Sequence, residues 1–209
     1  MGCDIHGWVE IKPWPKTSPD HWQSVVSIRP GIVGRNYDMF GLLFGVRNYV
    51  SQNAIAEGRG LPKYDKFQTK DKDDDDRPLT LKEREKWNGD GHSDTWISYS
   101  EIAAIDWEKE SEQEDERIHE YRVKEDGSEE YVGKAAMYGF LTEQELRTLS
   151  TKKVINKTNN GIKFRFKLEK TKLKDCLSGD WQVLFDIMKR LAEQQENKDN
   201  VRLVVWFDN

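Results

Sequence analysis

Residues 201–207 read Val-Arg-Leu-Val-Val-Trp-Phe, an apolar run that only Arg202 interrupts. β-Branched and aromatic residues favour strands, and a nearly continuous apolar run is typical of a strand in the middle of a sheet that is covered on both faces. Residues 3–11, near the other end of the chain, also favour a strand. We therefore expect an α+β fold whose central sheet, mixed or antiparallel, contains the N- and C-terminal strands and is flanked by helices.

Further elements are expected between these two strands. The patterns at residues 21–28 and 162–168 predict strands, and Asp126-Gly127 predicts a hairpin turn. Asp38 is expected to be the N-cap of a buried helix over residues 39–46. Capping boxes predict helix starts at Ser98 and Thr142, and an amphipathic pattern predicts a helix from residue 180. We expect one domain over residues 1–209, with residues 108–160 as a charged insertion.

The composition narrows the functional classes. The chain has 209 residues, is 34% charged and carries a net charge of −5. This charge argues against a general nucleic-acid binder but is compatible with a local cationic pocket. No apolar run approaches the roughly 20 residues of a membrane span, and the polar N-terminus does not resemble a signal peptide. We expect a cytoplasmic protein without a membrane partner, and homo-oligomerisation is left open.

One spacing occurs twice, in Asp4-Ile5-His6 and in Asp90-Gly91-His92. Side chains two apart in an extended backbone point to the same side, so each segment presents a carboxylate and an imidazole together. Two such pairs are suited to bind a divalent metal ion or to share acid–base catalysis. The alternative is that all four are hydrogen-bonded structural residues. If the first interpretation holds, His6 and His92 converge on one site.

Between the two pairs lie Arg and Asn residues next to aromatic residues and glycines. Arg binds phosphate in a forked manner, Asn reads ribose hydroxyls or base edges, and Tyr and Trp stack on bases. These side chains suit a small anionic nucleotide, unless the arginines simply pair with surface carboxylates. The candidate ligand-binding residues are Arg35, Asn36, Tyr37, Arg47, Asn48, Arg59, Ser93 and Trp96.

Five short motifs follow one another at residues 1–6 (MGCDIH), 35–37 (RNY), 46–48 (VRN), 59–62 (RGLP) and 90–93 (DGHS). In this order they resemble a family of small, mostly uncharacterised phage and bacterial proteins. The resemblance covers residues 1–107. By analogy of context, it implies a counter-defence protein in the host cytoplasm that acts on a nucleotide immune signal, such as a cyclic dinucleotide or a cyclic ADP-ribose isomer.

Three functional hypotheses follow. The first is hydrolysis of a phosphodiester or pyrophosphate bond in such a signal, with Asp4, His6, Asp90 and His92 as catalytic or metal-binding residues. The second is a non-catalytic sponge that sequesters the same nucleotide. The third is a structural or protein-binding phage protein. The sequence favours hydrolysis, because two Asp–His pairs exceed what the capture of an anion requires.

Overall fold

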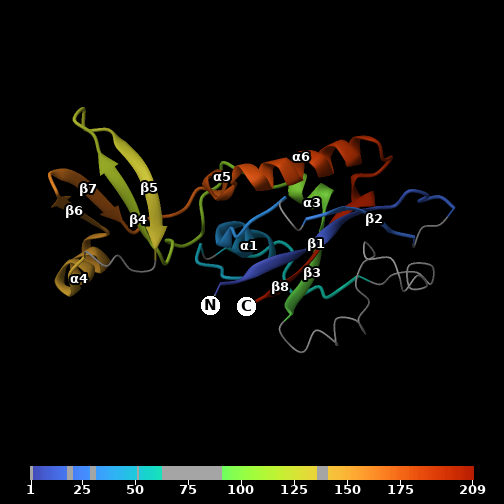
Figure 1. Cartoon of the computed structure of the whole chain (residues 1–209), viewed down its shortest axis with the longest axis horizontal. Coiled ribbons are helices and arrows are strands. Elements are labelled where there is room, and N and C mark those ends of the chain that lie inside the picture. The colour runs from blue at the N-terminus through green and yellow to red at the C-terminus, as the bar shows by residue number, and fades with distance from the viewer. Residues whose placement is uncertain (1, 18–20, 29–31, 51, 63–90, 136–140) are drawn as a thin grey trace.

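The described residues fold into two four-stranded antiparallel sheets with helices packed on them (Figure 1). The computed structural model describes residues 2–17, 21–28, 32–50, 52–62, 91–135 and 141–209. The first sheet has the order β2-β1-β8-β3. Its strands are β1 (Asp4–Ile11), β2 (Gln23–Ser27), β3 (His92–Ser98) and β8 (Val201–Asp208). The predicted α+β fold is confirmed, and the N- and C-terminal strands lie at the centre of this sheet.

The apolar run of β8 explains its central place. It pairs with β1 on one side, from Asp4 opposite Asp208 to Ile11 opposite Val201, and with β3 on the other. Phe207 faces the helix side, where its ring lies 5.1 Å from that of Phe40. Because neighbouring residues of a strand point to opposite faces, the preceding Trp206 lies on the far face. Both faces of the strand are buried, as the sequence predicted.

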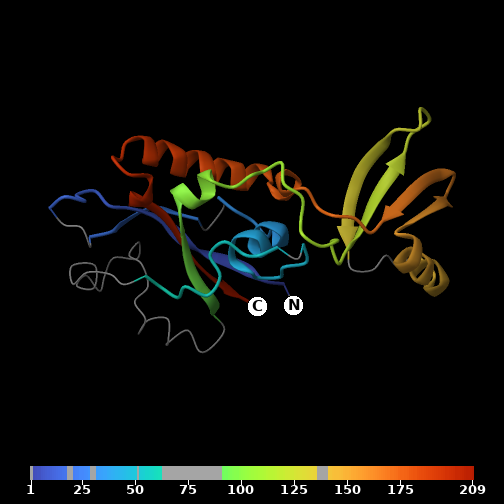
Figure 2. The same cartoon turned by 180° about the vertical axis from the view of Figure 1, so that it is seen from behind.

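Among the described residues, four helices accompany the first sheet: α1 (Tyr37–Phe44), α3 (Tyr99–Ala103), α5 (Leu173–Cys176) and α6 (Gly179–Glu193). Figure 2 shows α1 and α6 from behind. The predicted capping box at Ser98 is confirmed. The prediction that Asp38 caps α1 is wrong, because Asn36 accepts the hydrogen bond of the Met39 N–H instead, at 3.1 Å. The carboxylate of Asp38 instead forms ion pairs with Arg117 and Lys134.

The second sheet has the order β5-β4-β7-β6 and lies beyond α5 (Figure 1). Its strands are β4 (Ile118–Val123), β5 (Glu129–Ala135), β6 (Val154–Asn159) and β7 (Ile162–Lys167). The hairpin at Asp126-Gly127 is confirmed, since it joins β4 to β5. The segment 108–160 contains three of these strands, and β7 follows it.

Helix α4 (Glu143–Lys152) covers one face of the second sheet, and its predicted capping box at Thr142 is confirmed. Leu149 of α4 packs with Phe166 and Ile118 in a small core of its own. The opposite face carries the polar and aromatic side chains of β4 and β5. Within the described part of the chain, no helix is long and apolar enough to cross a membrane.

Candidate functional site

His6 lies on the face of the first sheet that points away from α1. It pairs in register with Trp206, and the two rings stack with their centroids 5.3 Å apart. Its Nε2 atom lies 3.0 Å from a carboxylate oxygen of Asp208. Asp4 shares this face but is held by Arg35, whose guanidinium donates to both carboxylate oxygens at 2.7 and 3.0 Å.

His92 lies on the other face of the same sheet. It pairs in register with Phe207, and the two rings stack at 6.1 Å. Its Nε2 atom lies 4.0 Å from Sγ of Cys3, and its Nδ1 atom 2.9 Å from Oγ of Ser93. Burial raises the pKa of the Cys3 thiol, although Arg47 opposes this shift. Cys3 is fully buried and belongs to the hydrophobic core.

The two histidines therefore do not converge on one site. His6 and His92 face opposite sides of the sheet because their partners on β8, Trp206 and Phe207, are adjacent in sequence. No three His, Cys, Asp or Glu side chains within the described ranges form a group that could hold a metal ion. Asp90 lies outside the described residues, so its predicted role is not addressed by the structure.

Three of the remaining candidate residues, Asn36, Tyr37 and Asn48, form hydrogen bonds with other parts of the chain. The side chain of Asn36 caps α1 and also donates to the Cys176 carbonyl at 2.8 Å. The hydroxyl of Tyr37 accepts the N–H of Cys3 at 3.1 Å. Asn48 closes a loop by exchanging two hydrogen bonds with the backbone of Gln52. These contacts leave the two asparagines with structural roles.

Arg59 and Arg47 also bind other parts of the chain. Arg59 donates to both carboxylate oxygens of Glu101, at 2.6 and 3.0 Å, and its guanidinium lies 5.0 Å from the ring centroid of Trp96. Arg47 donates to the side chain of Asn209 at 3.1 Å. Arg35 and Arg59 thus pair with carboxylates of the protein, as the alternative interpretation expects.

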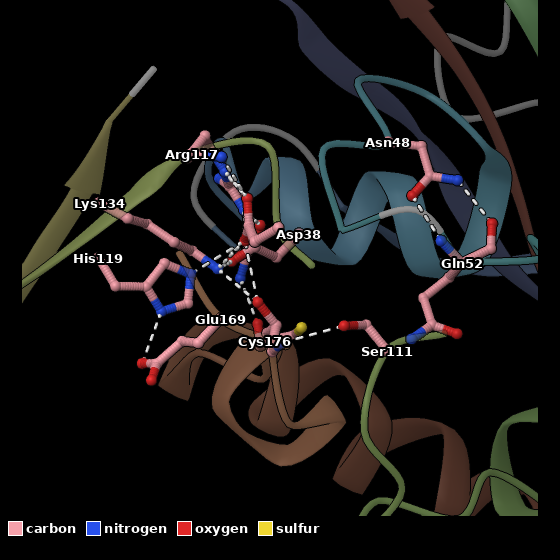
Figure 3. Close-up of polar contacts among 12 residues, drawn as sticks. Asp38, Asn48, Gln52, Ser111, Arg117, His119, Lys134, Glu169 and Cys176 are labelled. Carbon is pink, nitrogen blue, oxygen red and sulfur yellow. Dashed lines mark hydrogen bonds and ion pairs between the residues drawn. The ribbon is translucent and has the colours of Figure 1, made fainter. Parts of the chain in front are cut away.

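A second group of charged residues joins the two sheets, and the sequence did not single it out. We call it the junction cluster; its members are Asp38, Asp115, Arg117, His119 and Lys134, and Figure 3 labels all of them but Asp115. Arg117 contacts both carboxylates, and Lys134 lies 2.7 Å from Asp38 and 2.9 Å from Asp115. Asp38 comes from α1, whereas Lys134 comes from β5. The cluster is therefore a set of ion pairs across the junction.

Within the cluster Asp115 is the most deeply buried side chain, with an exposed fraction of 0%. Its burial alone would raise its pKa, but hydrogen bonds from His119, Arg117 and Lys134 outweigh this and lower it well below the usual range. Thr171 adds a further hydrogen bond at 2.9 Å. Asp115 is thus an ionised carboxylate whose charge is balanced by its neighbours.

His119 links the cluster to the surface. Its Nε2 atom lies 3.3 Å from Asp115, and its Nδ1 atom 3.2 Å from Glu169. The hydroxyl of Tyr121 donates to the same carboxylate of Glu169. Burial, together with this contact, raises the pKa of Tyr121. Both imidazole nitrogens therefore face carboxylates of the protein.

A cavity of about 910 Å³ lies against these residues. We call it the junction cavity. His119, Tyr121, Tyr131 and Lys134 contribute its sheet side, and the segment 169–177 contributes the opposite wall. A second hollow of about 400 Å³ shares Tyr131 and Lys134 with it. Arg35, Asn36 and Tyr37 line this second hollow, so the sequence did locate one edge of the region.

The junction cavity was missed because its residues come from segments that are far apart in sequence. One signal was present: a hairpin around Asp126-Gly127 brings Tyr121 opposite Tyr131, and the structure has this pair in register. The lysines at positions 170, 172 and 174 alternate directly after β7. Together these features could have indicated an aromatic, cationic surface.

Comparisons with known proteins add nothing to this geometry: no family model matches the chain, and searches of curated proteins and of solved structures found no match. The resemblance to phage and bacterial proteins therefore stays a prediction.

Proposed function

We propose that the protein binds and sequesters a small anionic nucleotide in the junction cavity without cleaving it. The observation that carries this proposal is the lining of the cavity, where Tyr121 and Tyr131 lie with four lysines, at positions 134, 170, 172 and 174. The volume of about 910 Å³ falls in the range of roughly 300–1,000 Å³ that is usual for ligand sites. Tyrosine rings stack on bases, and ammonium groups pair with phosphates.

The lining carries four lysines against three carboxylates, those of Glu110, Glu169 and Asp175. Lys170 and Lys172 are exposed, and neither forms an ion pair with another described residue. Lys174 pairs with Glu108 at 2.8 Å, and Lys134 is held by the junction cluster. Two ammonium groups, those of Lys170 and Lys172, are therefore available to a phosphate at the rim of the cavity.

Capture is favoured over hydrolysis by two arrangements. The separation of His6 and His92 on opposite faces removes the juxtaposition on which the preference for hydrolysis rested. In the junction cavity, both ring nitrogens of His119 already face carboxylates. With one nitrogen on Glu169 and the other beside the buried carboxylate of Asp115, neither nitrogen of this imidazole is directed at a ligand.

The test is to incubate the protein with a panel of nucleotides that includes ATP, ADP-ribose and cyclic dinucleotides, with and without EDTA. The free and bound fractions are analysed by chromatography before and after heat denaturation. Depletion of one nucleotide, followed by its intact release on heating, is the expected result. New products would mean hydrolysis, and no depletion of any nucleotide would overturn the proposal.

Two variants locate the site. Tyr131→Ala removes a ring with an exposed fraction of 54%, and Lys172→Ala removes a rim charge. Because the loss of one stacking partner costs about 1–3 kcal/mol, we expect Tyr131→Ala to weaken binding by at least ~5-fold. Lys189→Ala, at an exposed position of α6 away from the cavity, is the matched control for Lys172→Ala. Equal binding by all three variants and the unmodified protein would place the ligand elsewhere.

A further inference from the structure

The face of the second sheet that points away from α4 continues beyond the junction cavity. Pairing in register puts the following side chains of β4, β5 and β7 on this face, which we call the open face: His119, Tyr121, Val123, Glu129, Tyr131, Lys134, Lys163, Arg165 and Lys167. Phe164 and Phe166 alternate with the β7 members of the set and pack on the α4 side. No helix of the described chain covers the open face.

Strand β7 carries three cations on the open face, namely Lys163, Arg165 and Lys167. Residues two apart in a strand are separated by about 6.6 Å, so these charges form a row that runs away from the cavity. Arg165 lies in register with Tyr121, and the ammonium group of Lys167 lies 4.5 Å from the ring centroid of Tyr121. The row of cations thus begins beside the cavity.

Two tyrosines stand beside this row. The rings of Tyr121 and Tyr131 meet at 64° with their centroids 5.7 Å apart. Tyr131 has an exposed fraction of 54%, which is unusual for a large aromatic side chain in a sheet. Exposed aromatic rings next to a row of cations are the pattern by which proteins bind single-stranded nucleic acids, with bases on the rings and phosphates on the cations.

The local charge is the opposite of that of the whole chain. Residues 118–177 contain 13 Lys and Arg against 9 Asp and Glu, a net charge of +4, whereas the whole chain has −5. Glu129 offsets part of the row, since it pairs with both Arg165 and Lys167. Lys167 also lies 4.0 Å from Glu169, so the unpaired positive charge of the row lies at its far end. Lys163, at the far end, is exposed and forms no ion pair with another described residue.

We propose that the ligand of the junction cavity is the end of a single-stranded oligonucleotide, which continues over the open face. This inference rests on the proposed nucleotide binding and specifies the class of ligand. One base stacks on Tyr131 at the cavity, and the following phosphates lie along Arg165 and Lys163. The stacking and the phosphate contacts need no particular sequence, so the strand is bound through its backbone and the faces of its bases.

The experiment measures the binding of fluorescein-labelled oligothymidylates of 2, 4, 8 and 12 nucleotides, and of a 12-base-pair duplex, by fluorescence anisotropy. Binding of unlabelled mononucleotides is measured separately by calorimetry. We expect affinity to rise with length and to level off once the strand spans the open face, with weaker binding of the duplex. Removing one phosphate contact should reduce the slope of log affinity against log salt concentration by about 0.7.

Lys163→Ala is the central variant, because Lys163 lies outside the cavity and is exposed. We expect this substitution to lower the affinity for the 8- and 12-nucleotide strands several-fold and to leave mononucleotide binding unchanged. Arg147→Ala, an exposed position on α4 at the back of the sheet, is the matched control and should change neither. Circular dichroism and thermal unfolding verify that both variants are folded.

The outcomes separate this inference from the proposed function. The oligonucleotide proposal is wrong if mononucleotides bind but affinity does not rise with strand length. It is also wrong if Lys163→Ala and Arg147→Ala bind long strands equally well. In both cases the capture of a small nucleotide stands. If neither mononucleotides nor oligonucleotides bind, both proposals are wrong.

Discussion

The ammonium group of Lys134 lies 2.7 Å from a carboxylate oxygen of Asp38, and this ion pair ties the second sheet to helix α1 of the first (Figure 3). Both side chains have an exposed fraction of 11%. Arg117 contacts the other carboxylate oxygen of Asp38. Asp38 and Asp115 together balance these two cations, and among the described residues Asp38 is the residue of α1 that forms ion pairs with them.

Replacing Asp38 by Ala should destabilise the protein strongly. The substitution leaves Arg117 and Lys134 in a buried site with only Asp115 to balance them, and breaking a buried pair from one side costs about 3–5 kcal/mol. Urea unfolding followed by tryptophan fluorescence measures the loss. Glu196→Ala is the control, because Glu196 pairs with Lys16 in solvent and should change the free energy of unfolding by less than ~1 kcal/mol. Equal effects of the two substitutions would mean that the junction pair contributes little.

Asp115 should make stability depend on pH in the acid range. Its pKa in the folded protein is lowered from an ordinary value of 3.8, so its contribution is fully present above that value and is lost as the pH falls below about 4. We expect Asp115→Asn to be less stable at pH 7 and to show a flatter decline of the unfolding free energy between pH 5 and pH 2. Asp186→Asn, at an exposed position of α6, should keep the slope of the unmodified protein. An unchanged slope in Asp115→Asn would assign the acid sensitivity to other carboxylates.

Arg59 should matter for stability and not for ligand binding. It makes a two-pronged contact with Glu101 and also donates to the carbonyls of Ile55 and Trp96. Lysine cannot reproduce this forked geometry, so Arg59→Lys should cost roughly 1–3 kcal/mol of unfolding free energy. Nucleotide affinity should be unchanged. Arg190→Lys, at an exposed position, is the neutral control. A loss of affinity without a loss of stability would restore Arg59 as a ligand-binding residue.

His6 and His92 should act independently of each other. They stack on different residues, Trp206 and Phe207, on opposite faces of the sheet. In a double-mutant cycle with His6→Ala and His92→Ala, we expect the effects on unfolding free energy to add to within about 0.5 kcal/mol. The same cycle is measured with Mn²⁺ or Zn²⁺ present. A coupling of more than ~1 kcal/mol that appears only with metal would instead indicate a shared metal site.

The sequence by itself determined the centre of the first sheet and several helix starts. The apolar run at 201–207 requires burial on both faces, and only a central strand provides that, so β8 lies between β1 and β3. Capping boxes are local, because residues three apart satisfy each other's backbone groups, and those at Ser98 and Thr142 form as predicted. The hairpin at Asp126-Gly127 is local for the same reason.

Only the tertiary structure decided which side chains meet. A spacing of two residues places Asp4 and His6 on one side of their own strand, but strand pairing decides which face of the sheet that side becomes. In the register with β8, His6 lies opposite Trp206 and His92 lies opposite Phe207, so the two histidines are on opposite faces of the sheet. The junction cavity likewise combines residues from β4, β5 and the segment 169–177, which no local pattern connects. Such a site depends on long-range packing, because the pairing of β4 with β5 aligns its sheet residues and the hydrogen bond of Thr171 to Asp115 holds the segment 169–177 beside them.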